Sequence, residues 1–266
     1  MAEIKNIHDH FFKRFFSDVA NVRELLNLVL PTEVREQLDL SVISLEPTSY
    51  VSEEYRASLS DLVIKTRTKR KRISVDIYFL FEHKSYPDKR APVQLLRYMY
   101  LEWRQDQEEK RPLRVIIPVV FYHGRRPWNI PTDFMDQFSV PEELKPFMLN
   151  FRYILFDTNQ WDWKKASSAV VKENVFALTA VLLMMAASRR DLEIVRRVLQ
   201  LWQEMGIIKE KELFTFIMIY IVETQDVSLS KIEKILEETH IKGEDIMPTL
   251  AQRLREEGYK AGIEQG

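Results

Sequence analysis

The chain of 266 residues contains no cysteine. This absence excludes disulfide bonds, thiolate catalysis and zinc sites with cysteine ligands, and it is compatible with a reducing cytoplasm. An excess of positive charge is also missing, because 39 lysine and arginine residues face 40 aspartate and glutamate residues. The molecule therefore has no overall field that would attract nucleic acid, and any contact with DNA must come from local basic patches.

Long apolar segments are absent as well. The N-terminal sequence MAEIKNIHDHFFKRFF carries charges where a signal peptide needs an apolar run, so we expect no export and a cytoplasmic location. The most apolar stretch, residues 175–187, is far shorter than the roughly 20 residues of a membrane helix. It predicts a buried core helix, and the chain as a whole predicts no membrane partner.

Hydrophobic periodicity changes at about residue 163. Before it, helical spacing alternates with runs of β-branched residues, and after it every segment has helical character. The predicted elements of the first part are a helix over 8–30 ended by Pro31, strands near 44–50, 59–67 and 73–82, a helix over 91–108, a strand over 113–122 with a break or bulge at Pro118, and a strand over 151–156. We therefore predict a mixed α/β sheet domain over 1–163 and a helical domain over 164–266.

Two carboxylates and a lysine stand at the ends of the second and third predicted strands. Glu82 and Lys84 point to the same face because side chains alternate along a strand. Asp61 lies on the neighbouring strand of the predicted hairpin, where a carboxylate can meet Glu82 across the pair. Two carboxylates can hold Mg²⁺ against a phosphate, and a nearby lysine can orient or activate the attacking water. This trio predicts metal-dependent hydrolysis of phosphodiesters.

Each of these residue patterns also has an ordinary structural explanation. A glutamate and a lysine at a strand end commonly form a solvated ion pair, but Glu82 follows the apolar run 77–81 and precedes a turn, which favours a site. Gln94 and Tyr98 share one face of the next helix and could hold a phosphate or the attacking water. The alternative for this second pair is a partly exposed helix face.

Several longer segments resemble the Rpn family of recombination-promoting nucleases, whose members are also called transposases, within the PD-(D/E)XK superfamily. The segments are HDHFFKRFFSD, SLSDLVIK, YFLFEHKSYPD, QLLRYMYLEW and IIPVVFYHGRRPW. The resemblance implies a restriction-endonuclease-like core and DNA cleavage linked to recombination. It also implies dependence on Mg²⁺ or on another divalent cation such as Mn²⁺ or Ca²⁺.

The resemblance also implies roles for individual residues. Asp61 and Glu82 correspond to metal ligands, Lys84 to the catalytic lysine and Gln94 to a supporting residue. Many family members carry glutamine where Lys84 stands and lack Gln94, so this chain is closer to the general superfamily pattern. His8 and Asp9 match the family too, either in catalysis or as the cap of the first helix.

Two further patterns suggest contacts with partners. Six of the eight residues 65–72 are basic and stand at the predicted hairpin tip, where Lys69, Arg70, Lys71 and Arg72 either contact DNA phosphates or form a solvated turn. The last nine residues carry glycine at every fourth position, 258, 262 and 266. On a helix this spacing gives a smooth stripe that suits a homo-oligomer formed through the C-terminal helical region, and the alternative is a frayed tail.

The sequence as a whole predicts a metal-dependent DNA endonuclease. The alternative is a non-catalytic module that binds nucleic acid or protein and keeps a nuclease-like fold. A third hypothesis, a transposase with three catalytic carboxylates, needs one more acid at the site, and Asp76 is the only nearby candidate on that strand face.

Overall fold

A computed structural model describes residues 2–46, 62–82, 86–168, 175–241 and 252. Its internal contacts divide the chain into two compact units, one formed by His8–Asp162 and the other by Met1–Ile7 together with Trp163–Gly266. The division falls beside residue 163, where the periodicity of the sequence changes. The first seven residues, which we placed in the first domain, group with the second unit instead.

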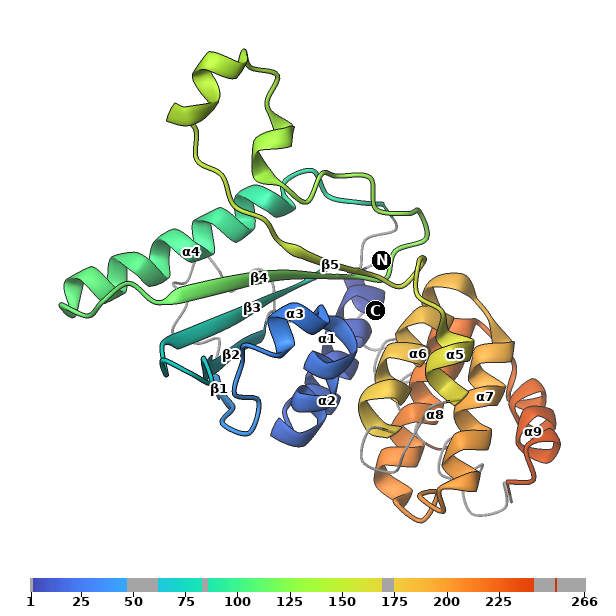
Figure 1. Ribbon diagram of the computed structural model, residues 1–266. Coiled ribbons are helices and arrows are strands. Elements are labelled where there is room, and N and C mark those ends of the chain that lie inside the picture. Colours follow the sequence, from blue (N-terminus) through green and yellow to red (C-terminus); the bar gives the residue numbers. More distant parts are fainter. Residues whose placement is uncertain (1, 47–61, 83–85, 169–174, 242–251, 253–266) are drawn as a thin grey trace, which may run out of the picture. The chain divides into compact units, whose positions relative to one another are not determined.

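The unit His8–Asp162 is built on a five-stranded mixed sheet (Figure 1). Its strands follow one another in the order of the sequence: β1 (Ser44–Glu46), β2 (Leu62–Arg67), β3 (Ser74–Glu82), β4 (Val115–Tyr122) and β5 (Ile154–Asp157). The first three strands pair antiparallel, and β3, β4 and β5 pair parallel. The predicted mixed α/β fold and the predicted hairpin between the second and third strands are confirmed.

Helices cover both faces of this sheet (Figure 1). On one face, α4 (Ala91–Glu108) buries Leu95, Tyr98 and Met99 against Tyr78 and Leu80 of β3. These three residues recur at the spacing of one helix face, which is why the segment forms an amphipathic helix. On the other face, α1 (Ala2–Phe16) packs Phe12 against Phe121 of β4, with ring centroids 6.1 Å apart.

The predicted N-terminal helix over 8–30 is in fact two helices. The first ends at Phe16, and α2 (Val19–Val29) begins after Asp18, whose carboxylate accepts a hydrogen bond from the amide of Ala20 at 2.7 Å. The hydrophobic spacing continues across the break, so periodicity alone could not reveal it, whereas the capping aspartate could have. A short helix, α3 (Thr32–Arg35), follows Pro31.

The break predicted at Pro118 does not occur. This residue pairs with Tyr78 of β3 in an uninterrupted parallel register from Val115 to Tyr122. The neighbouring strand β5 pairs with β4 only from Val119 onward. No hydrogen bond to β5 is therefore lost because Pro118 lacks an amide hydrogen. A proline is therefore accommodated inside a buried strand.

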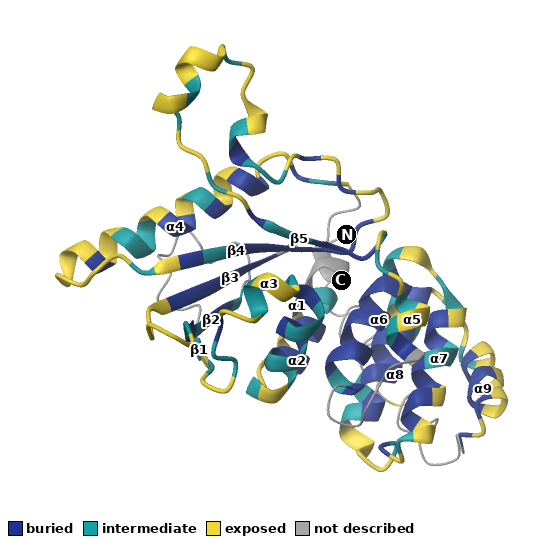
Figure 2. Ribbon diagram, viewed as in Figure 1, coloured by how far each residue is buried: buried dark blue, intermediate teal, exposed yellow. Residues whose placement is uncertain are grey.

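The second unit is helical in the part of it that the structure describes. Its helices are α5 (Trp163–Ser168), α6 (Val175–Arg189), α7 (Leu192–Glu204), α8 (Lys211–Gln225) and α9 (Leu229–Glu238). Figure 2 shows α6 buried along most of its length, which confirms the core helix predicted over 175–187. None of the described helices is both long enough and apolar enough to span a membrane.

Candidate active site

One of the predicted catalytic residues, Glu82, lies at the end of the sheet where β3 finishes. Glu82 is the last residue of β3, and its Cα pairs with that of Tyr122 on β4, which in turn pairs with Asp157 on β5. The carboxyl ends of three parallel strands therefore meet in one row, which is the place where open α/β sheets bind ligands. The structure describes the backbone of Glu82, while Asp61 and Lys84 lie outside the described residues.

The described neighbours of Asp61 follow the predicted hairpin. Leu62, the residue after Asp61, pairs with Phe79 of β3, and the antiparallel register continues without interruption to Arg67 and Ser74. The strand that follows Asp61 is thus hydrogen-bonded to the strand that carries Glu82. Whether the two carboxylates and Lys84 face one another remains a prediction.

Two histidines lie at the same end of the sheet. His123 directly follows β4 and is 2% exposed, and its ring lies edge-on to that of His8 on α1, with the centroids 5.2 Å apart. The sequence pattern did not predict His123 as a site residue, although its position directly after a buried strand could have indicated it. Imidazoles at this edge can hold or donate a proton close to the end of β3.

Asp9, next to His8, is 6% exposed and lies in the interior of α1, which begins at Ala2. Since a capping residue precedes the first helical turn, the hypothesis that Asp9 caps the first helix is wrong. A buried carboxylate on the helix that packs at this edge is compatible with the other hypothesis, a role in catalysis.

A second acid at this edge has a structural role. One oxygen of Asp157 accepts a hydrogen bond from the amide of Trp128 at 3.0 Å, and the other accepts from the amide and the side chain of Asn159 at 2.9 and 2.8 Å. Asp157 therefore fastens the segments that follow β4 and β5, and it supports the row of strand ends in which Glu82 stands.

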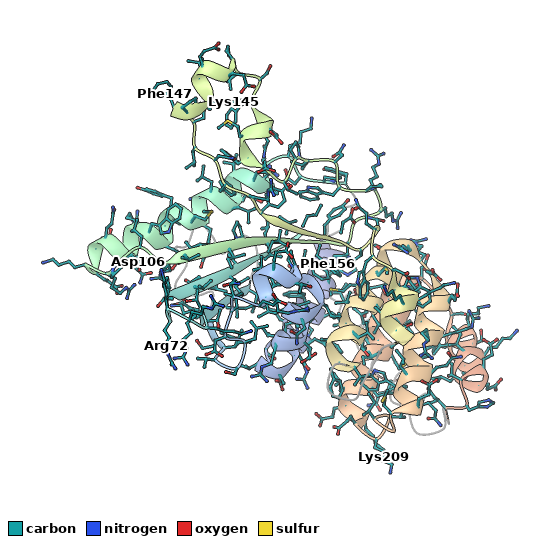
Figure 3. The ribbon with its side chains drawn as sticks, in the orientation of Figure 1. Arg72, Asp106, Lys145, Phe147, Phe156 and Lys209 are labelled. Atoms are coloured by element: carbon teal, nitrogen blue, oxygen red, sulfur yellow. The ribbon has the colours of Figure 1, made fainter. Side chains whose placement is uncertain are left out.

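The basic residues lie at the opposite end of β3. Lys69, Arg70, Lys71 and Arg72 are all exposed at the tip of the β2–β3 hairpin, and Figure 3 shows Arg72 pointing away from the sheet. At about 3.3 Å per residue, the eight steps from Ser74 to Glu82 span roughly 26 Å. The tip therefore cannot grip the phosphates next to the scissile bond, but it can contact DNA further along a duplex.

The structure separates Gln94 from Tyr98. Gln94 is exposed on α4, whereas Tyr98 is 1% exposed and stacks on Tyr78, with the rings 3.7 Å apart and nearly parallel. The interior position of Tyr98 leaves its ring no surface with which to touch DNA. Gln94 is exposed to solvent, so its side chain is accessible to a substrate, as a supporting residue must be.

Asp76 does not supply a third catalytic carboxylate. It lies six residues before Glu82, roughly 20 Å away along the strand. Its side chain is 4% exposed and is bound to Arg114 at 2.9 Å. One ion cannot be shared across such a distance, because metal–oxygen bonds are only about 2.0–2.6 Å long. The geometry contradicts a three-carboxylate site that includes Asp76.

Comparisons with known proteins relate the chain to a family of transposases and to nucleases. The model of the family described as "Putative transposase, YhgA-like" matches residues 6–213. The inactive recombination-promoting nuclease-like protein RpnE of Escherichia coli (strain K12) is 27% identical over 265 residues, which cover 97% of this chain and 85% of that protein. No solved structure gives a significant match to the chain.

Two similar proteins are named as nucleases. The recombination-promoting nuclease RpnD of Escherichia coli O157:H7 is 33% identical over 139 residues, 50% of this chain and 52% of that protein. The recombination-promoting nuclease RpnC of Escherichia coli (strain K12) is 29% identical over 139 residues, 51% of this chain and 45% of that protein. The chain thus spans about half the length of these two nucleases.

Proposed function

Because the chain belongs to the YhgA-like transposase family, whose relatives include the Rpn nucleases, we propose that it is a metal-dependent DNA endonuclease that promotes recombination. The observation that supports this proposal most directly is the position of Glu82. It stands at the carboxyl end of β3, in register with the ends of β4 and β5, and belongs to a Glu-x-Lys pattern. The relatives support a nuclease-type function in general.

The proposed ligands suit a hard divalent cation. Asp61 and Glu82 would supply carboxylate oxygens, which Mg²⁺ and also Mn²⁺ or Ca²⁺ prefer. When bound, such a cation neutralises the phosphate and lowers the pKa of a coordinated water. Lys84 would orient the attacking water and stabilise the negative charge that develops on the phosphate. Gln94, exposed on α4, would support the substrate from the neighbouring helix.

The second candidate function is a non-catalytic module. It is favoured by one observation: the relative that matches almost the whole chain is named as inactive. Against it, this chain retains Asp61, Glu82 and Lys84 together. Titration of Mg²⁺ or Mn²⁺ into the wild type and into Asp61→Ala separates the two functions, because a module would give equal heats with both proteins, whereas the nuclease would lose heat in Asp61→Ala.

The decisive experiment is plasmid nicking by the purified full chain in Mg²⁺, Mn²⁺ or Ca²⁺. We expect Lys84→Ala to lower the nicking rate on the order of 10²-fold, since charge-stabilising groups contribute effects of about this size. Lys89→Ala changes the same residue type at an exposed position five residues away and should leave the rate unchanged. Nicking that persists in Lys84→Ala would point to a contaminant or to a different site.

A further inference from the structure

Three acidic side chains from three elements converge far from Glu82, between the sheet and α4. They are Glu46 of β1, Asp76 of β3 and Glu102 of α4, and each offers a carboxylate oxygen within 4.8 Å of the others. The side chains of Asp76 and Glu102 are only 4% and 12% exposed. Because Ca²⁺–oxygen bonds measure about 2.3–2.6 Å, a single ion can reach three oxygens spaced in this way.

Basic partners occupy one oxygen of each carboxylate. The ammonium of Lys65 lies 2.7 Å from Oε1 of Glu46, and Nη1 of Arg114 lies 2.9 Å from both Oδ2 of Asp76 and Oε2 of Glu102. Within the described part of the chain, the second oxygen of each carboxylate accepts no hydrogen bond. Three oxygens with remaining coordination capacity therefore belong to the cluster.

The charges of the cluster do not balance. Arg114 is also bound by Asp106, which pairs in turn with Arg111, and Arg111 pairs with Glu109 as well. Five carboxylates therefore share the three cations Lys65, Arg111 and Arg114. Burial raises the pKa of Asp76 and of Glu102 in spite of the neighbouring guanidinium. Burial of the charged forms of Asp76 and Glu102 is thus energetically unfavourable without a further cation, and a bound cation would reduce this unfavourable free energy.

Tyr98 adds a further oxygen and independently points to a ligand. Its side chain is 1% exposed, and its hydroxyl has no hydrogen-bond partner in the part of the chain that the structure describes. The ring stacks on Tyr78, which shares a strand face with Asp76, and Glu102 follows one helical turn after Tyr98. Burial, together with the negative charges of Glu102, Asp76 and Glu46, raises the pKa of this phenol.

We propose that Glu46, Asp76, Glu102 and the hydroxyl of Tyr98 form a divalent-cation site, separate from the proposed catalytic metal at Glu82. The irregular set of oxygens from three elements suits Ca²⁺ better than Mg²⁺, which demands near-octahedral geometry. The ion takes the place of the Lys65 ammonium, whose side chain is 37% exposed and can move into solvent. The two charges of the ion replace the single charge of the Lys65 ammonium and so reduce the excess of negative charge in the network by one.

Such an ion connects β1, β3 and α4 and stabilises the folded unit. We expect millimolar Ca²⁺, compared with EDTA, to raise the melting temperature of the full chain, because a ligand that binds only the folded state stabilises it. The rise in melting temperature should persist in Glu82→Ala, which lacks a proposed ligand of the catalytic metal, and it should be lost in Glu102→Gln. Lys65→Gln should show a larger rise than the wild type, because the competing ammonium is gone.

Two further variants keep the test decisive. Glu108→Gln changes an exposed glutamate on the same helix and should keep the full rise. Tyr98→Phe retains every charge and should reduce the rise, which covers the case in which Glu102→Gln does not fold. A rise that is equal in Glu102→Gln and the wild type, or absent from both the wild type and Lys65→Gln, would overturn the proposal. A rise that disappears only in Glu82→Ala would assign the ion to the catalytic site.

Discussion

At the scale of single residues, one guanidinium organises the buried charges beneath α4. Arg114 binds Asp76, Glu102 and Asp106, and the pKa values of these acids move in different directions. Hydrogen bonds from Arg114 lower the pKa of Asp106 to about 2, whereas burial dominates for Asp76 and raises its pKa. Arg114 therefore outweighs the cost of burying the charge of Asp106, but it does not outweigh this cost for Asp76.

The opposed shifts predict opposite effects of pH in two variants. A carboxylate whose pKa is lowered by folding stabilises the protein above its unfolded pKa of about 3.8, and this contribution is lost as the pH falls towards 2. Asp106→Asn lacks that contribution. Although this variant is less stable at neutral pH, its free energy of unfolding should fall less steeply than that of the wild type between pH 4 and pH 2.

Asp76→Asn provides the matched comparison. A carboxylate with a raised pKa binds a proton more readily in the folded state and so gains stability as the pH falls. Removing it should make the free energy of unfolding fall more steeply on acidification than in the wild type. Urea unfolding at a series of pH values measures both slopes, and parallel curves for the wild type and Asp106→Asn would contradict the argument.

The sequence could predict single residues only where they are close along the chain. Glu82 and Lys84 are two residues apart and follow an apolar run, so a local pattern is enough to predict them as site residues. Asp76 and Arg114 are separated by 38 positions, and their pairing depends on the parallel register of β3 and β4. The contact between His8 and His123 depends on how α1 packs, which periodicity does not specify.

At the scale of elements, strong periodicity predicted the type of most segments, while boundaries and breaks depended on single capping residues. The helix predicted over 91–108 coincides with α4, because its apolar face is regular and Pro92 fits the first turn. The α1–α2 break at Asp18 was missed because both helices bury the same kind of residue. The sheet register in turn placed the basic hairpin tip at the end of β3 remote from Glu82.

This placement leads to a prediction for DNA binding. Each phosphate contact that is lost reduces the slope of log K against log salt by about 0.9. Replacing Lys69, Arg70, Lys71 and Arg72 with glutamine should therefore flatten the slope for duplexes long enough to span the roughly 26 Å between the tip and the proposed site. For a duplex too short to reach both, the variant and the wild type should have similar slopes.

The control for the hairpin variant is Lys209→Gln, which removes an exposed charge from the helical unit (Figure 3). Fluorescence anisotropy with labelled duplexes over a series of salt concentrations measures the slopes. Equal slopes for the hairpin variant and the wild type on long duplexes would mean that the tip is a solvated turn. The nuclease chemistry would be unaffected by that result, because the tip lies away from Glu82.

At the scale of the whole molecule, the proposed catalysis and DNA binding belong to only one of the two units. Every residue still proposed for catalysis or DNA binding lies between Asp61 and Gln94, inside the unit His8–Asp162. The helical unit has a dense core of its own, in which Trp202 is completely buried and donates a hydrogen bond to Thr179 at 2.8 Å. The change of periodicity at residue 163 reflects this second core, but helical periodicity carries no information about chemistry.

The division predicts that equivalent tryptophan substitutions in the two units have different consequences. Trp202→Ala should cost about 3–5 kcal/mol of stability in the helical unit. Below the temperature at which that unit unfolds, we expect the nicking rate to be unchanged, since the proposed chemistry lies elsewhere. Trp128→Ala should instead lower the nicking rate, because the indole of Trp128 donates a hydrogen bond to Tyr153 at 3.0 Å and packs edge-on against Tyr122, which belongs to the row of strand ends that includes Glu82. Hydrogen exchange measured by mass spectrometry can follow each unit separately, and loss of nicking in Trp202→Ala while the sheet unit keeps its protection would show that catalysis needs both units.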